Sequence, residues 1–157
     1  MIARTGLLAI ALMSAACASQ AQMTGRVVVS SMGPQPVTTL QVDSGGPYIL
    51  EGAYEPELAR LDGALVEVFG RMTDAAPHGG IAVERYVVLE IAGERPFVGR
   101  LHADGTGLTL EDGTMLRLEG LPEPIRRAGA ALIWVTGERA GDRVQVRSAG
   151  VIAPGGS

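Results

Sequence analysis

The chain of 157 residues contains no lysine, one cysteine, two histidines and few aromatic residues, which make up 4% of it. Its positive charge comes from scattered arginines, and the formal net charge is −4. A surface that follows a nucleic-acid backbone needs clustered positive charge, and binding of single strands also needs exposed aromatic side chains for base stacking. The composition therefore argues against a nucleic-acid partner.

Long hydrophobic runs are also scarce. The apolar run over residues 7–13 is too short to span a bilayer as a helix, and the run over residues 87–92 is interrupted by Glu90. Arg4 precedes the first run and the small residues 14–16 follow it. This pattern predicts a signal peptide over residues 1–16 and no membrane-spanning helix after it.

The only cysteine, Cys17, directly follows this segment and has no partner for a disulfide within the chain. Residues 14–17 resemble a bacterial lipobox, with Ser14 at the position where that pattern prefers leucine. The resemblance implies a diacylglycerol on the Cys17 thiol. Since Ala18 follows, it also implies a lipid anchor in the outer membrane, facing the periplasm. Ordinary cleavage after Ala18 or Ala21 is the alternative, and it predicts a soluble periplasmic or secreted protein.

The body of the chain contains an internal repeat. Residues 39–58 and 107–126 align without gaps and are identical at seven of twenty positions. The identical pairs are Leu40/Leu108, Gly45/Gly113, Leu50/Leu118, Glu51/Glu119, Gly52/Gly120, Glu55/Glu123 and Pro56/Pro124. Each copy is therefore expected to form the same supersecondary unit.

Alternating apolar residues and glycine-rich turns predict short strands in both copies. In the first copy we expect strands over residues 26–31, 37–43, 48–52, 64–70 and 81–91, and a short helix over residues 55–61. In the second we expect strands over residues 97–102, 106–111, 114–119, 130–137 and 143–152, and a helix over residues 122–128. Residues 17–24 are predicted to be a polar tether, residues 25–93 the first barrel and residues 94–154 the second.

Each copy thus follows the order β-β-β-α-β-β. A helix between the third and fourth of five strands is the pattern of the OB-fold, a small Greek-key barrel. The sequence predicts a mainly β protein with two tandem OB-fold-like barrels after a signal peptide, and a tandem SH3-like barrel is the alternative.

The glycine and leucine pattern extends over nearly the whole chain after residue 16. It includes the hairpin residues Gly45-Gly46 and Asp112-Gly113 and strands expected to end at Gly70 and Gly137. In this pattern the chain resembles uncharacterised bacterial exported lipoproteins with tandem OB-fold-like domains. The resemblance implies a fold and no activity.

Grouped catalytic residues are missing from the sequence. His78 and His102 lie in different copies without metal-ligand spacing. The repeated acids Glu55 and Glu123 occupy predicted helix starts, where the backbone dipole favours carboxylates. We therefore predict no catalytic residue, no metal site and no cofactor.

Binding is the more natural use of such a chain. OB-folds that bind ligands use the face of strands two and three with the adjoining loops. In the first copy this predicts a binding surface that includes Gln35, Thr39, Gln41, Arg71 and His78. The corresponding positions in the second copy are Thr109, Glu111, Arg117 and Glu119.

Each copy is so small that it would be only marginally stable as an isolated domain, so the barrels are expected to pack together. The candidates for this contact are apolar residues on the outward face of the fourth strand. They are Leu65 and Phe69 in the first copy and Leu132 and Trp134 in the second. Trp134 filling its own barrel is the alternative.

These observations favour a non-enzymatic envelope lipoprotein that binds or scaffolds a protein, a peptide or a glycan. Its other expected partner is the membrane, through the N-terminal lipid. The alternatives are an enzyme or enzyme-accessory subunit whose site cannot be grouped from sequence, and a small-molecule or cation-binding stress protein similar to other exported OB-fold proteins.

Overall fold

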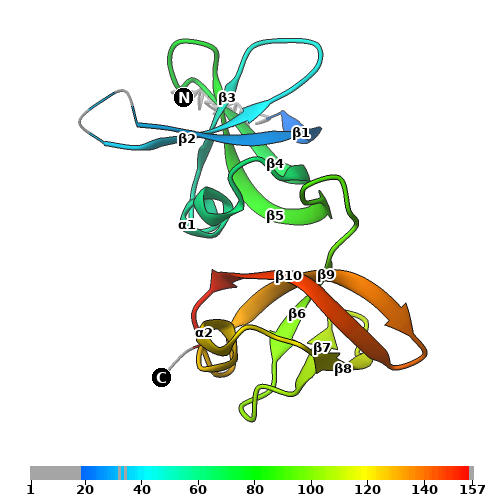
Figure 1. The fold of residues 1–157 in the computed structure, drawn as a ribbon. Helices are drawn as coiled ribbons and strands as arrows, with labels where there is room; N and C mark the ends of the chain where they lie inside the picture. Colours follow the sequence, from blue (N-terminus) through cyan, green and yellow to red (C-terminus); the bar gives the residue numbers. More distant parts are fainter. Residues whose placement is uncertain (1–18, 32, 34, 156–157) are drawn as a thin grey trace, which may run out of the picture.

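The computed structural model describes residues 19–31, 33 and 35–155, which form two closed five-stranded β-barrels in tandem. Figure 1 shows the barrels one above the other, joined by a single connection between β5 and β6. The predicted signal peptide and Cys17 lie outside the described residues.

The first barrel contains β1 to β5 with a short helix between β3 and β4. Its elements are β1 (Gln20–Ser30), β2 (Val37–Gln41), β3 (Tyr48–Glu51), α1 (Glu55–Leu58), the 3-10 turn η1 (Ala59–Leu61), β4 (Leu65–Thr73) and β5 (Gly80–Glu90). The second barrel repeats the order. Its elements are β6 (Phe97–Leu101), β7 (Gly107–Leu110), β8 (Met115–Glu119), α2 (Glu123–Arg126), β9 (Leu132–Ala140) and β10 (Arg143–Ala153).

The strand order around the first barrel is β1-β2-β3-β5-β4, and the second barrel has the equivalent order. One neighbouring pair in each barrel is parallel, β3 with β5 and β8 with β10, whereas the other neighbours are antiparallel. With the helix between the third and fourth strands, this is an OB-fold-like barrel. The fold predicted from the repeat is confirmed.

The repeat has the same strand register in both copies. Leu40 lies opposite Tyr48 in the first hairpin, and their counterparts Leu108 and Leu116 lie opposite each other in the second. Leu40 and Leu108 are both fully buried. Register is set by which face of a strand must be buried, so the repeated leucines fix the pairing of both hairpins.

The predicted tether over residues 17–24 is wrong from residue 20 onward. Residues 20–24 belong to β1, which pairs with β4 along Gln20 to Arg26. Ala21 is buried and Met23 packs against the core, while Gln22 and Thr24 alternate with them. The polar residues of this stretch lie on the outward face of a strand, and the period of two was the signal for it.

The outward face of β9 joins the two barrels. Leu132 and Trp134, with Val98 of β6, pack against the hydrophobic cluster that includes the first-barrel core, and buried Ile152 of β10 belongs to that cluster. The Arg60 guanidinium donates a hydrogen bond to the carbonyl oxygen of Ile152 at 3.2 Å. Two of the four residues predicted for this contact therefore lie in it.

The other two, Leu65 and Phe69, are not among the residues of that cluster. Both alternate outward on β4, as predicted, but the first barrel meets the second at the end where α1 and η1 lie. Phe69 instead lies beneath Arg85, whose guanidinium carbon is 3.8 Å from the ring centroid. The second barrel thus contributes the outward face of β9, and the first barrel contributes its α1 and η1 end. The contact is therefore heterologous, because the two surfaces are not equivalent.

None of the helices in residues 19–31, 33 and 35–155 has the length and apolar character to cross a membrane.

Candidate functional site

The surface predicted on the first barrel is spread over several elements. Thr39 and Gln41 lie on β2, where the Thr39 hydroxyl donates to the carbonyl oxygen of Val28 at 3.1 Å and Gln41 is exposed. Gln35 is exposed between β1 and β2. Arg71 is engaged in an ion pair with Glu84, at 2.8 Å.

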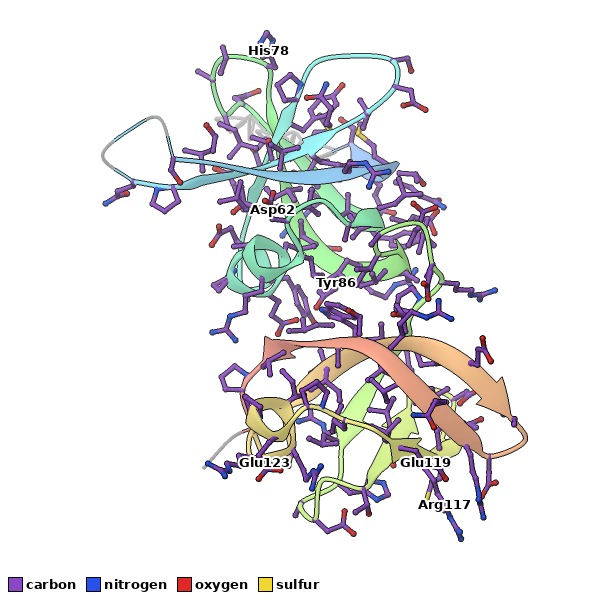
Figure 2. The ribbon with its side chains drawn as sticks, viewed as in Figure 1. Asp62, His78, Tyr86, Arg117, Glu119 and Glu123 are labelled. Atoms are coloured by element: carbon purple, nitrogen blue, oxygen red, sulfur yellow. The ribbon has the colours of Figure 1, made fainter. Side chains whose placement is uncertain are left out.

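His78 lies in the loop between β4 and β5 and packs against Gly46 of the β2–β3 hairpin. Figure 2 shows it at the end of the first barrel that is far from the second barrel. None of these five side chains lines either of the two cavities described below. They lie on separate elements of the first barrel, and the structure does not bring them together around either of these cavities.

The larger cavity is a groove of about 960 Å³ between the two barrels. Its walls come from α1 and β5 of the first barrel, from the connection, and from β6, β7 and the start of β9 in the second. The residues lining this groove are Tyr54, Glu57, 85–88, Arg95, Pro96, 98–103, 109–111, Ala130 and Leu132. Ligand pockets commonly have volumes of about 300–1,000 Å³, so the groove is large enough for a peptide or an oligosaccharide.

The first-barrel wall is a fixed cluster of two tyrosines and one acid. The rings of Tyr54 and Tyr86 meet edge to face, with 5.7 Å between their centroids and an interplanar angle of 74°. The Tyr86 hydroxyl donates to Glu57 Oε2 at 2.6 Å. Burial, and then this hydrogen bond to the carboxylate, raise the pKa of Tyr86 far above its ordinary value. The phenol therefore stays neutral and holds β5 to α1.

The second-barrel wall is the outward face of neighbouring strands. Arg100 on β6 lies opposite Thr109 of β7 and Leu132 of β9. Its guanidinium donates to the carbonyl oxygen of Ala130 at 3.2 Å. His102 Nε2 and the Thr109 hydroxyl are hydrogen-bonded at 2.8 Å. Arg100, His102 and Thr109 thus place polar groups on this wall, among apolar residues such as Val98 and Leu132.

Three of the arginines that line the groove form no ion pair with the described residues. Seven of the twelve arginines among residues 19–31, 33 and 35–155 form ion pairs. Of the other five, Arg85, Arg95 and Arg100 line the groove. Two acids, Glu57 and Glu111, line it as well, and Glu57 is already bound by Tyr86. With histidine counted as neutral, these five side chains give the groove lining a formal charge of +1, in a chain whose net charge is −4.

A smaller cavity of about 500 Å³ lies on the second barrel. Arg117 and Asp142, which line it, form an ion pair at 3.5 Å. Glu119 of the same cavity pairs with Arg143 at 3.5 Å. Of the second-copy positions noted in the sequence, Thr109 and Glu111 line the groove, whereas Arg117 and Glu119 line this smaller cavity.

The repeated acids each have a local partner. Glu51 accepts a hydrogen bond from the Thr73 hydroxyl at 2.7 Å, and Glu55 accepts one from the buried Thr38 hydroxyl at 2.5 Å. Glu123, the counterpart of Glu55, pairs with Arg126 of α2 and with Arg127, which directly follows α2. Among the described residues, no three His, Cys, Asp or Glu side chains form a group that could hold a metal ion.

Neither a protein-family model, nor a curated protein, nor a solved structure matches this chain. The candidate site is therefore defined by its geometry alone. Sequence reasoning missed the tyrosine pair, Arg95 and Arg100. One signal for Arg100 was the alternation of Val98, Arg100 and His102 with buried neighbours along β6. Nothing in the sequence placed these residues opposite α1.

Proposed function

We propose that this chain is a non-enzymatic, lipid-anchored protein of the bacterial cell envelope that binds a protein, peptide or glycan in the groove between its barrels. The observation that carries this proposal is the groove itself. It has the volume of a ligand site, walls on both barrels, and three lining arginines that form no ion pair among the described residues. Sites between domains are a common place for ligands to bind.

The anchor in this proposal is a lipid on Cys17 that attaches the chain to the outer membrane on its periplasmic side. Several acyl chains give stable anchoring, whereas one gives only marginal binding. Labelling of cells with a fatty-acid probe tests this step. Label should enter the wild-type chain and disappear in Cys17→Ser, and label that persists in the variant would contradict the anchor.

The groove is tested by photo-crosslinking in intact cell envelopes. A photoreactive amino acid replaces exposed Glu111, which lines the groove, and in a matched variant it replaces exposed Gln41 on β2. We expect a partner to be captured from position 111 and not from position 41. Capture from position 41 alone would place binding on the first-barrel surface predicted from sequence, and capture from neither would contradict the proposal.

A hydrolytic function is the second candidate. His102 and the Thr109 hydroxyl are hydrogen-bonded, as a catalytic base and its hydroxyl nucleophile have to be. Such a pair also needs a third group to orient the base. Among the described residues, no hydrogen bond to His102 Nδ1 provides one. Screening with activated esters tests this candidate, and turnover that disappears in Thr109→Val would replace binding by catalysis.

A further inference from the structure

One edge of β5 is without a strand partner along most of its length. β5 pairs with β4 from Gly80 to Glu90, but with β3 only from Gly80 to Ala82. After Glu51 the chain leaves β3 and forms α1. Within the described part of the chain, the opposite edge of β5 from Val83 onward therefore faces no strand.

This edge borders the groove, since residues 85–88 line it in an unbroken run. The same four residues pair with β4 in regular antiparallel register, from Phe69 opposite Arg85 to Val66 opposite Val88. In such a pair, every second residue directs its N–H and C=O groups away from the partner strand. No hydrogen bond from a loop or a side chain of the described residues reaches the backbone of these four. An edge of this kind is a template for another strand.

The charged residues that line the groove are three arginines and two glutamates, Glu57 and Glu111, and Glu57 already accepts the hydrogen bond of Tyr86. Arg95 is exposed on the connection and Arg100 is exposed on the opposite wall, and neither has a carboxylate partner among the described residues. The guanidinium of Arg85 is held over the ring of Phe69. Arginine binds carboxylates through two parallel hydrogen bonds, so acidic side chains of a ligand would find partners on two sides of the groove.

We propose that an extended, acidic peptide segment of another protein binds in the groove as an added strand on β5. This inference rests on the proposed function, because it names the ligand of the same groove. Main-chain hydrogen bonds to β5 provide the affinity, as in other cases of strand addition. Arg95 and Arg100 provide the preference for acidic side chains.

The probe is a fluorescent seven-residue peptide of alternating glutamate and valine, titrated against the full-length chain in detergent with anisotropy as the readout. The matched probe replaces each glutamate by lysine. We expect the acidic peptide to bind and the basic one to bind at least about tenfold more weakly, with an affinity that falls as salt rises.

Two N-methylated versions of the acidic peptide test strand addition. Methyl groups are placed on the amide nitrogens of odd residues in one version and of even residues in the other. Because only alternate residues of a strand face a given neighbour, one version should lose binding and the other should keep it. Equal binding of both versions would overturn strand addition.

Three charge-reversal variants test the arginines. Arg95→Glu and Arg100→Glu should each weaken the acidic peptide about tenfold, because attraction becomes repulsion. Arg139→Glu is the control, since Arg139 is exposed on β9, forms no ion pair within the described part of the chain and does not line the groove. It should leave the affinity unchanged, and an equal loss in all three variants would contradict the assignment.

The outcomes separate this inference from the function on which it rests. If a partner is captured at position 111 but the acidic peptide is not preferred, the proposal of an acidic added strand is wrong and the proposal of binding in the groove is retained. Tighter binding of the lysine peptide, or of a neutral oligosaccharide such as chitotetraose, leads to the same conclusion. Absence of both a captured partner and peptide binding overturns both.

Discussion

The Tyr86 hydroxyl donates a hydrogen bond to Glu57 at 2.6 Å and so ties β5 to α1 on the side of the first barrel that forms a wall of the groove. Figure 2 shows Tyr86 at the level where the two barrels meet. The bond joins two elements separated by β4 in the sequence. The same side chain therefore contributes to the stability of the first barrel and to the shape of the groove.

Tyr86→Phe should destabilise the protein by about 1–2 kcal/mol, because the partly buried Glu57 carboxylate loses its donor. Urea unfolding at neutral pH measures this change through the midpoint at unchanged slope. Tyr48→Phe is the matched control, since no hydrogen bond of the Tyr48 hydroxyl is found among the described residues. A loss in the control equal to that in Tyr86→Phe would show that the Glu57 bond contributes nothing.

The pKa of Tyr86, raised by burial first and by Glu57 second, predicts a loss of stability at alkaline pH. The folded state binds the phenolic proton more tightly than the unfolded state, whose tyrosine ionises near the ordinary pKa of 10.0. The contribution is therefore complete below pH 10 and is lost as the pH rises above it. Urea midpoints measured across this window should fall more steeply for wild type than for Tyr86→Phe, and parallel curves would contradict the shift.

Trp134 should contribute more to stability than Phe69, although both were predicted to join the barrels. Trp134 packs against the first-barrel cluster, and a Cβ added at Gly150 would lie 2.6 Å from its Nε1. We expect Trp134→Ala to cost about 2–3 kcal/mol, below the range for fully buried rings. Phe69→Ala removes mainly the stacking with Arg85, which is about 0.5–1 kcal/mol. Urea unfolding compares the two, and a larger loss for Phe69→Ala would contradict the assigned contact.

The fold could be predicted from the sequence because both copies of the repeat keep the leucines and glycines that determine the strand pairing. Leu40 and Leu108 had to be buried, and a glycine had to follow each hairpin strand, so the hairpins and their register were determined locally. Alternation also showed which residues of β4 and β9 face outward. It could not show what the outward face meets, because that depends on how one barrel is placed on the other.

The candidate site was mostly beyond prediction for the same reason. When β4 and β9 are aligned at their first residues, Leu65 and Leu132, Trp134 corresponds to Glu67, which accepts a hydrogen bond from Gln22 within the first barrel. The copies have therefore diverged at the contact, and reading them as equivalent led to Leu65 and Phe69. The groove combines α1 and β5 of one copy with β6 and β7 of the other. Because the two copies contribute different elements to the groove, comparing their sequences does not reveal it.

The repeated glycines Gly70 and Gly137 give a test of the fold in both copies. They were expected to end strands, but β4 continues to Thr73 and β9 to Ala140. A Cβ at Gly70 would overlap the carbonyl oxygen of Ala82, and a Cβ at Gly137 that of Gln145. Both sites lie beside an irregularity in the pairing with the last strand of the barrel. The glycines allow two backbones to approach closely where the strands bend.

Gly70→Ala and Gly137→Ala should each destabilise the protein by about 3 kcal/mol, since the methyl group forces the two strands apart. Gly113→Ala is the control. It has the positive φ of +83° but open space around it, so only the backbone strain of about 1 kcal/mol is expected. Urea unfolding of the three variants gives the comparison. Gly137 also has a positive φ, of +153°, whereas Gly70 has none, so Gly70 and Gly113 are the decisive pair. A loss at Gly113 as large as the loss at Gly70 would contradict the view that close approach of the strands is the main cost.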